Sequence, residues 1–547
     1  MNMQMKRSML ASLLIAGLMA TPSLRAAPAR TCESLTMLKL PRATIVSAKA
    51  VKAGPTTMTT FMGPVTLEVP ARCEVRGISR PSLDSEIGFE VWLPLDGWNG
   101  KYQQKGNGGF AGSVNRVSLV DPLRRGYVVA ATDDGHDATK TPQGTFAVGH
   151  PEKVIDFGYR AVHDTSEQAK AITAAFYGKA PARNYFVGCS DGGREALMEA
   201  QRFPEDFDGI LAGAPANDWS HLFTSFVWNE LALSRQRIPL EKLPALQRAV
   251  IAACDEADGL KDGLVSSPPA CHFNPAVLVC KGDEGPDCLT PAQTDTLNAL
   301  YSGPKHPGTG ERIFPGLVTS GTEALPMNWP LWVLGAAPGQ SAHAAFGISY
   351  FRDVVFENPG WQLQSMNFDR DLRISHDKVA PLLNSTSPDL RSFRARGGKL
   401  IHYHGWGDAA IAAPTSIEYY EAVRAFMSTA PDPRAKTQSV DDFYRLFMVP
   451  GLAHCSGGVG PVHFGNDADY GPAPAANTDP ERDVFSALER WVEHGIAPDR
   501  LIGSGPSPLD ATKTLTRPLC PHPRVMKYKG AGSADDAANF VCEAAER

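Results

Sequence analysis

Short apolar runs bounded by turn-forming residues recur along this chain of 547 residues. Each run is rich in Val, Ile, Leu, Phe or Tyr and has Gly, Pro or Asp at its ends, a pattern that favours a buried β-strand. The predicted strands cover residues 87–95, 126–135, 184–188, 208–215, 398–405 and 443–451. A further strand-like stretch surrounds Tyr102.

Segments with helical periodicity lie between several of these strands. Residues 164–178 begin with a possible Asp or Thr cap, and residues 479–495 begin with Asp479 and Pro480. The apolar positions of the second segment share one face: Val484, Leu488, Trp491 and Val492. Strands that alternate with helices predict an α/β fold, with a mainly parallel sheet covered by helices on both faces.

The alternation stops between residues 217 and 396, where prolines, tryptophans and irregular loops dominate. A separate domain with its own role is one interpretation. Because strand-like segments resume at residue 398, we favour an insertion that forms a lid over the ligand edge of the sheet. The predicted organisation is a signal peptide at 1–26, a first core part at 27–216, a lid at 217–396 and a second core part at 397–547.

Composition and charge indicate a globular protein and exclude some partner classes. The chain is 43% hydrophobic and 20% charged, and its formal net charge is −6. No block of Lys or Arg would attract phosphates or an anionic membrane, so we expect neither nucleic acid nor a membrane as a partner. Nothing in the sequence predicts an oligomeric state.

The N-terminus has the layout of a secretory signal peptide. Lys6 and Arg7 precede an apolar run from Met9 to Ala20, and small and polar residues follow. A buried N-terminal helix is the alternative, but the order of charged, apolar and small residues favours export to the periplasm or the medium, with cleavage near Ala26 or Ala27.

Ten cysteines in an exported chain predict disulfides. Sequence alone does not fix their connectivity. Pairing by proximity joins Cys32 to Cys73, Cys254 to Cys271, Cys280 to Cys288 and Cys520 to Cys542, and it leaves Cys189 and Cys455 for each other.

Ser190 is the candidate nucleophile. It lies in Gly188-Cys189-Ser190-Asp191-Gly192, directly after an apolar strand and directly before a helical run. This context is typical of a nucleophile elbow, the tight turn that exposes a catalytic serine. A serine needs a base, an acid that orients the base, and donors for the oxyanion.

The acid and the base are expected after later strands, in the order Ser, Asp or Glu, His. Asp408 follows the strand at 398–405, and His454 follows the strand at 443–451 in a loop of small residues. His402 and His404 alternate along the strand before Asp408, and their alternative roles are core or pocket-lining residues.

The oxyanion hole is expected to combine two backbone segments. The N–H of Asp191 is the first expected donor, and Gly108 or Gly109 in "KGNGGFAGS" could supply the second. A phosphate-binding loop is the alternative for this glycine-rich stretch. It is disfavoured because no Gly-Lys-Ser/Thr ends the stretch.

The loop "CDEADGLKDGLV" concentrates three carboxylates, those of Asp255, Asp258 and Asp262. Carboxylates that converge on one loop repel one another unless a cation or water separates them, and Ca²⁺ accepts carboxylate and carbonyl oxygens in flexible geometry. The spacing is not that of an EF-hand, and a solvated acidic turn is the alternative. Zinc is disfavoured because the ligands would all be oxygen atoms.

The motifs resemble the tannase and feruloyl esterase family, which also includes a bacterial hydrolase of mono(2-hydroxyethyl) terephthalate. They are "GCSDGG", "HCSGG", "GNGGFAGS", "ATDDGH", "GAPAN" and "YHGWGD". The resemblance covers nearly the whole mature chain and implies an α/β-hydrolase core with a lid. It also implies a serine esterase in which a Cys189–Cys455 disulfide ties Ser190 to His454, with Asp408 as the acid.

The same resemblance implies a structural Ca²⁺ in the lid. Its ligands would be the side chains of Asp255, Asp258 and Asp262 and the carbonyls of Leu260 and Leu264. It further implies esters of aromatic acids as substrates, and we rank feruloyl esters first, galloyl esters second and a terephthalate monoester third. Ile411 could border the acyl ring.

Two rival interpretations remain open: a different nucleophile, and a protein that is not an enzyme. Cys189 could itself be the nucleophile of a thiol hydrolase. A non-catalytic binding protein on a hydrolase fold is the other rival, although such a protein would be expected to lack one of Ser190, Asp408 and His454.

Overall fold

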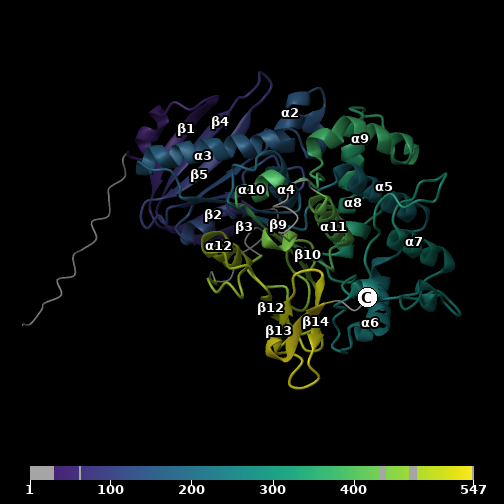
Figure 1. The fold of residues 1–547 in the computed structure, drawn as a ribbon. Coiled ribbons are helices and arrows are strands. Elements are labelled where there is room, and N and C mark those ends of the chain that lie inside the picture. Colours follow the sequence, from purple (N-terminus) through teal and green to yellow (C-terminus); the bar gives the residue numbers. More distant parts are fainter. Residues whose placement is uncertain (1–29, 61–62, 430–438, 467–476, 545–547) are drawn as a thin grey trace, which may run out of the picture.

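A nine-stranded sheet forms the centre of the computed structural model, which describes residues 30–60, 63–429, 439–466 and 477–544 (Figure 1). The signal peptide predicted at 1–26 lies outside the described residues. In spatial order the strands are β1 (Ala43–Val51), β4 (Arg72–Ser79), β5 (Ile87–Pro94), β7 (Val128–Thr132), β6 (Lys101–Lys105), β8 (Arg183–Cys189), β9 (Gly209–Gly213), β10 (Lys399–Gly405) and β11 (Tyr444–Val449).

The sheet is mainly parallel, as the sequence predicts. Neighbouring strands from β7 to β11 in the spatial order pair in parallel, whereas β1, β4 and β5 form an antiparallel edge. Each predicted strand is present, including the one around Tyr102. The sequence did not predict β1 and β4, which extend the sheet beyond β5.

Apolar side chains at consecutive strand positions explain why both faces of the sheet are covered. On β8, Phe186 packs into one apolar cluster and Tyr185 into another, and Leu400 and Ile401 on β10 divide in the same way. Successive side chains of a strand point to opposite faces. A strand that is apolar at consecutive positions therefore has to be buried on both sides.

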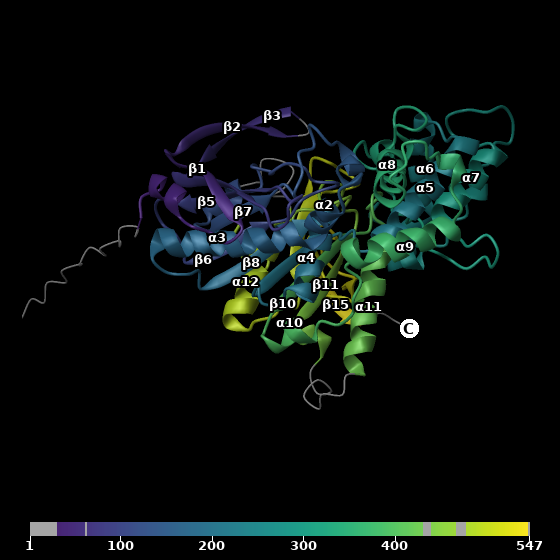
Figure 2. The same ribbon diagram turned by 90° about the horizontal axis from the view of Figure 1, so that it is seen from above.

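Helices from different parts of the chain cover the two faces (Figures 1 and 2). The first face packs against α3 (Ala161–Tyr177), α4 (Asp191–Arg202) and α11 (Pro414–Ser428). The second face packs against α12 (Val484–His494) and α1 (Val120–Arg124).

The start of each predicted helix differs from the expectation. α3 begins at Ala161, before Asp164, because α2 (Pro151–Ile155) and a π-helical turn at Asp156–Arg160 lead into it without a break. α12 begins at Val484, where the Asp483 carboxylate accepts a hydrogen bond from the backbone N–H of Ser486. Asp483, not Asp479, is therefore the cap.

Residues 217–396 contain helices and no β-strand. The helices are α5 (Trp219–Arg235), α6 (Leu243–Cys254), α7 (Pro291–Ser302), α8 (Ala342–Ser349), α9 (Arg370–Leu383) and α10 (Arg391–Ala395). Figures 1 and 2 show α5 to α9 gathered at one side of the sheet. Along the chain, this segment lies between the sheet strands β9 and β10.

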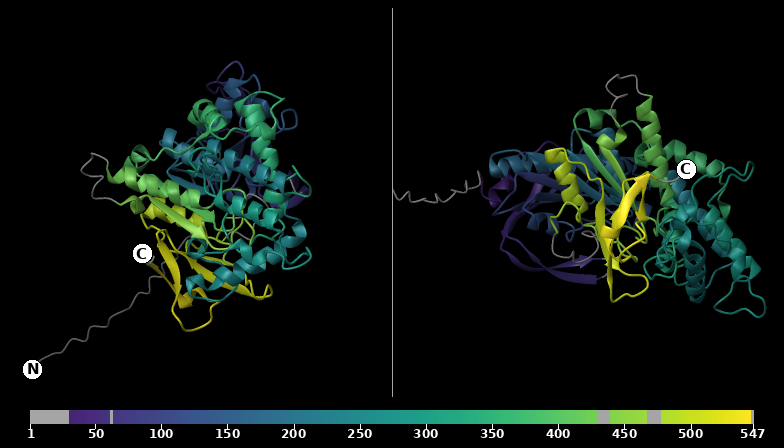
Figure 3. Two further views of the ribbon diagram at one scale, coloured as in Figure 1. Left: turned by 90° about the vertical axis from the view of Figure 1, so that its right-hand side faces the viewer. Right: turned by 60° about the horizontal axis from the view of Figure 1, so that its bottom comes forward.

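Three small antiparallel sheets complete the described structure: β2 (Gly54–Thr60) with β3 (Gly63–Val69), β12 (Leu501–Pro506) with β13 (Thr514–Leu519), and β14 (Arg524–Tyr528) with β15 (Phe540–Ala544). The last four strands lie in the yellow region in Figure 3. Among the described helices, none has the length and apolarity that crossing a membrane requires.

Five disulfides join the ten cysteines. The structure contains the same five pairs that proximity in the sequence gives: Cys32–Cys73, Cys254–Cys271, Cys280–Cys288, Cys520–Cys542 and Cys189–Cys455. Two of the short-range pairs lie within residues 217–396, and the Cys189–Cys455 pair joins two loops of the central sheet.

Candidate active site

The turn between β8 and α4 exposes Ser190 in a strained backbone conformation. Its φ is 67°, a left-handed value that non-glycine residues rarely adopt. Side chains are excluded around it, because a Cβ added at Gly188 would lie 2.4 Å from the carbonyl oxygen of Gly192, and one at Gly193 would lie 2.2 Å from that of Gly213. The glycines of the motif thus allow the turn to form.

Ser190, His454 and Asp408 form a hydrogen-bonded row. The Nε2 atom of His454 lies 2.8 Å from the Oγ of Ser190, and its Nδ1 atom lies 2.8 Å from the Oδ2 of Asp408. These contacts connect loops that follow β8, β10 and β11. The arrangement can withdraw a proton from the serine and stabilise the imidazolium that results.

Asp408 is fully buried and surrounded by donors. Burial alone would raise the pKa of its carboxyl, but the His454 ring and hydrogen bonds from His404 and His454 hold that pKa well below its usual range. The other oxygen of Asp408 accepts hydrogen bonds from the backbone N–H groups of Ala410 and Ile411. Asp408 therefore stays ionised and fixed in place.

The two histidines that precede Asp408 have different positions. His404 lies 3.2 Å from the Oδ2 of Asp408 through its Nε2 atom, and its Nδ1 contacts the hydroxyl of Ser416. His402 contacts Tyr444 and the same serine, and burial lowers its pKa well below the usual value. His402 is a core residue, while His404 supports the carboxylate.

The Cys189–Cys455 disulfide links the residue before Ser190 to the residue after His454. The two Cα atoms lie 5.9 Å apart although 266 positions separate them in sequence. A thiol nucleophile at Cys189 is thereby excluded, since the sulfur is already bonded. The covalent link holds the loops of Ser190 and His454 together.

Backbone N–H groups beside Ser190 are available to bind an oxyanion. Within the described structure, no acceptor is present for the N–H of Asp191, Gly108 or Gly109. The preceding residue, Asn107, is fixed against α4 because its carbonyl accepts a hydrogen bond from Gly192, at 2.8 Å. The structure thus brings the glycine-rich loop and the start of α4 together.

Aromatic side chains from residues 217–396 border this row. The ring of Trp332 meets the ring of His454 edge-on, with centroids 5.0 Å apart, and it stacks on Phe346 at 6.1 Å. A Cβ added at Gly109 would lie 3.1 Å from the Phe346 ring. The sequence did not predict either residue, and Trp332 and Phe346 place a flat apolar surface beside His454 and Gly109.

Ile411, the expected neighbour of the acyl ring, is buried among apolar residues. It belongs to the same cluster as Phe110, Trp219 and Phe223. Its backbone N–H donates a hydrogen bond to the carboxylate of Asp408. Trp332 and Phe346 pack against the same cluster, so a place beside the acyl ring stays a prediction for Ile411.

The acidic loop predicted to bind Ca²⁺ lies beside β13. Asp255 accepts hydrogen bonds from the N–H groups of Asp262 and Gly263, and Asp262 accepts one from Arg517 at 2.6 Å. Burial raises the pKa of Asp258 to about 6, and the charges of Asp262 and Asp255 add to this effect. The three carboxylates therefore repel one another.

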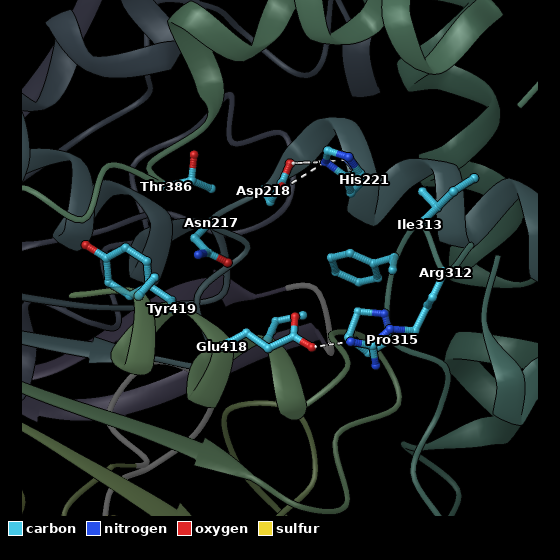
Figure 4. A pocket seen from close by; sticks show the side chains of 12 residues that line it. Asn217, Asp218, His221, Arg312, Ile313, Pro315, Thr386, Glu418 and Tyr419 are labelled. Carbon is cyan, nitrogen blue, oxygen red and sulfur yellow. Dashed lines mark hydrogen bonds and ion pairs between the residues drawn. The ribbon is translucent and has the colours of Figure 1, made fainter. Parts of the chain in front are cut away.

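A pocket of about 370 Å³ lies between α11 and the segments near residues 218 and 313 (Figure 4). Its charged side chains already pair with one another: Asp218 with His221, and Arg312 with Glu418 at 2.7 Å. None of Ser190, Asp408 and His454 lines it.

The comparisons with known proteins agree on one family. The family described as "Tannase and feruloyl esterase" matches residues 73–543. An uncharacterized esterase of Xanthomonas campestris is 44% identical, over 96% of this chain and 93% of that protein. The mono(2-hydroxyethyl) terephthalate hydrolase of Piscinibacter sakaiensis is 33% identical, over 87% and 85%.

A solved structure extends the likeness to three dimensions. The crystal structure of feruloyl esterase B from Aspergillus oryzae superposes with a TM-score of 0.81 at 30% identity, and it covers 94% of this chain and 99% of that one. The similarity therefore includes both the sheet and residues 217–396.

Proposed function

Because the chain belongs to the tannase and feruloyl esterase family, we propose that this esterase cleaves esters of aromatic acids with Ser190 as its nucleophile. The observation that carries the proposal is the row Ser190–His454–Asp408, with 2.8 Å between the reacting nitrogen and oxygen. Membership of an esterase family sets the binding-protein alternative aside.

The first half of the reaction forms an acyl-enzyme. The Oγ of Ser190 attacks the ester carbonyl while the Nε2 of His454 takes the hydroxyl proton. The carbonyl oxygen becomes an anion that the N–H groups of Asp191 and of Gly108 or Gly109 stabilise. Collapse of the tetrahedral intermediate breaks the ester bond, and His454 returns the proton to the leaving alcohol.

The second half releases the acid by the same route. Water enters, loses a proton to the Nε2 of His454 and attacks the acyl carbon. The tetrahedral intermediate collapses, Ser190 leaves as alkoxide and recovers the proton from His454, and the aromatic acid departs. Asp408 stays ionised throughout, since its role is to orient the imidazole and to stabilise its charge.

The aromatic surface beside His454 supports an aromatic acid as the acyl part of the substrate. Trp332 and Phe346 offer flat apolar rings against which an aromatic acyl group can stack. We propose feruloyl esters as the main substrates, galloyl esters second and the terephthalate monoester third. The segment 217–396 acts as the lid that supplies these rings.

The experiment for this ranking compares kcat/KM on methyl ferulate, methyl gallate and mono(2-hydroxyethyl) terephthalate under one set of conditions. Preference for methyl ferulate is expected. A large preference for either of the other two esters would overturn the ranking and leave the serine mechanism standing.

We also propose that the acidic loop holds a structural Ca²⁺. The donors suit this ion in chemistry, because they are all oxygen and the carbonyls of Leu260 and Leu264 accept no hydrogen bond within the described structure. The three carboxylates are not gathered to within 4.8 Å of one another, so binding would draw them together. Ligands would be these carbonyls together with Asp255, Asp258 and Asp262, while Arg517 offsets part of the charge. When bound, the ion would stabilise the loop without taking part in bond cleavage.

Metal analysis after extensive dialysis tests this assignment. One Ca²⁺ per chain is expected, together with a lower unfolding temperature after chelation. Asp258→Asn should reduce the metal content, whereas Asp287→Asn, at an exposed acid of the same segment, should not. Metal-free protein of unchanged stability would contradict the site.

Export is the last part of the proposal. Five disulfides are typical of proteins from oxidising compartments. N-terminal sequencing of the secreted or periplasmic protein should find a start near Ala26 or Ala27, and an uncleaved Met1 terminus would count against the signal peptide.

A further inference from the structure

Three buried carboxyl groups lie together behind the candidate oxyanion hole. One oxygen from each of Asp134, Asp191 and Glu195 lies within 4.8 Å of the others, and this is the one such group of acidic, His or Cys side chains among the described residues. Each of the three is at most 1% exposed. Asp134 follows β7, whereas Asp191 and Glu195 belong to α4.

One of these charges is already balanced. The guanidinium of Arg194 contacts both carboxylate oxygens of Asp191, at 2.5 and 3.1 Å, and its remaining N–H groups donate to the carbonyls of Phe157 and Gly158. Arg194 therefore neutralises Asp191, which leaves Asp134 and Glu195 without a cation of their own.

Asp134 has no hydrogen-bond donor. Neither of its carboxylate oxygens has a partner in the described structure, and its side chain is inaccessible to solvent. An ionised carboxylate in such a place would be very costly, since neither water nor a donor replaces its hydration. A protonated Asp134 has instead one O–H to donate, and the neighbouring acceptor is Glu195.

Glu195 contacts the glycine-rich loop directly. Its two oxygens accept hydrogen bonds from the backbone N–H of Asn107, at 2.9 Å, and from the Asn107 side-chain amide, at 3.1 Å. Asn107 immediately precedes Gly108 and Gly109, and the N–H of Gly192 binds its carbonyl. Glu195 thus determines where this loop lies relative to Ser190.

We propose that Asp134 and Glu195 share a single proton, and that this protonated pair is a positioning device that holds Asn107, and with it the second arm of the oxyanion hole. The inference rests on the proposed serine mechanism. Loss of the proton would place two adjacent negative charges behind the donors that must bind an oxyanion, so turnover should fall when the pair ionises.

Burial sets the pH range of this change. It raises the pKa of Glu195 to about 7, with Asp191 adding to the effect, and it raises the pKa of Asp134 well above its usual value. The charged groups near the pair are Asp191 and Arg194 on α4, with Glu199 one turn further along. On the turn after β7, burial also raises the pKa of Asp133 to about 7, and Lys153 donates to the carbonyl of Gly135.

His136 follows on the same turn as Asp134. Burial lowers the pKa of His136 to about 4, so it is neutral where the pair titrates. Between the pKa values of Glu195 and Asp134 the pair holds one proton, and this shared proton should be lost only as the pH rises toward the higher pKa, that of Asp134.

The test is the pH profile of kcat for methyl ferulate between about pH 5 and pH 10. Asp134→Asn supplies a permanent N–H donor to Glu195 and removes the titrating proton. We expect this variant to keep kcat within ~3-fold of the parent at neutral pH and to lose the alkaline decline. Asp134→Ala lacks the donor and should lower kcat ~10²-fold with KM little changed.

Glu199→Gln is the matched control. Glu199 lies on the same helix, is equally buried and also has a raised pKa, caused first by burial and then by Asp206, but it makes no contact with Asn107 in the described structure. Its variant should retain the parent's alkaline decline. Infrared difference spectra between the parent and Asp134→Asn, which cancel the bands of Glu199 and other buried acids, should show a protonated carboxyl band of the parent that disappears over the same pH range as kcat.

Three results would overturn the inference: an alkaline decline in Asp134→Asn identical to that of the parent, the absence of the band, or a stoichiometric metal ion that this variant loses. Failure of the serine mechanism itself would look different, because Ser190→Ala would then retain parental activity. The pH profiles and the Ser190→Ala rate therefore separate the two failures.

Discussion

The edge of the sheet and the helical segment 217–396 both contribute to the site, but they do so by different means. At the sheet edge, glycines without side chains, a disulfide and buried hydrogen bonds fix Ser190 and its partners. The helical segment contributes Trp332 and Phe346 through ring packing alone. Changes at the edge should therefore affect every ester alike, whereas changes at the rings should distinguish one ester from another.

The largest effect is expected from Ser190→Ala. Without the nucleophile no acyl-enzyme forms, and kcat on methyl ferulate should fall ~10⁶-fold. Mass spectrometry of the parent after mixing with a slow ester should show an adduct that the variant lacks. Activity near the parental level would show that Ser190 is not the nucleophile and would contradict the assignment of the chemistry to the sheet edge.

Asp408→Asn should come next. The amide keeps the shape of the side chain but lacks the charge that stabilises the His454 imidazolium, so kcat should fall ~10⁴-fold on all three esters. The control is Asp441→Asn, a change at a half-buried residue near β11 whose partner is Tyr420, which should leave the rate unchanged. A loss confined to one ester would contradict the assignment of Asp408 to the shared chemistry.

Reduction of Cys189–Cys455 should have an intermediate effect. A shift of about 1 Å between Ser190 and His454 can cost ~10²-fold in rate. The double variant Cys189→Ala/Cys455→Ala should thus lose activity at temperatures where circular dichroism still shows a folded protein, although closing so long a loop can contribute on the order of 5 kcal/mol to stability.

Removal of Cys280–Cys288 by paired alanines provides the comparison for that variant, since this disulfide closes a short loop within residues 217–396. Its activity should remain near that of the parent. Full activity after complete reduction of the Cys189–Cys455 link would show that noncovalent contacts suffice to hold the two loops.

Trp332→Ala should give the smallest effect and the most selective one. Loss of the ring should lower kcat/KM ~10-fold on methyl ferulate and much less on an acetate ester, which has no ring to stack. Trp228→Ala is the matched control because Trp228 packs against Phe368 and donates to Ala299 within the same segment. An equal loss on both esters would assign the ring to holding His454 instead.

The sequence predicted the strands well and the helix starts poorly. Consecutive apolar positions such as Tyr185 and Phe186 identify a strand buried on both faces, and this pattern is local. The start of α3 depends on the preceding π-helical turn at Asp156–Arg160, which gives no such pattern. The antiparallel edge formed by β1 and β4 was missed because β1 is exposed at most of its positions and charged residues interrupt β4, so neither forms a continuous apolar run.

Sequence motifs brought Ser190, Asp408 and His454 into one hypothesis because their order and strand context are characteristic. Asp134 and Glu195 could not be paired in that way, since nothing in either local sequence indicates the other. The only signal was the doubled acid in "ATDDGH". Trp332 and Phe346 occur in an irregular aromatic-rich stretch, where any of several rings could have faced the site.

The sequence by itself determined the alternation of strands and helices, the nucleophile turn and the family, because these depend on short-range spacing and on residue types that few other arrangements require. The tertiary structure decided which charges are isolated from water and which rings lie beside the nucleophile. Desolvation and contact depend on what surrounds a side chain in space, and those neighbours come from distant parts of the chain.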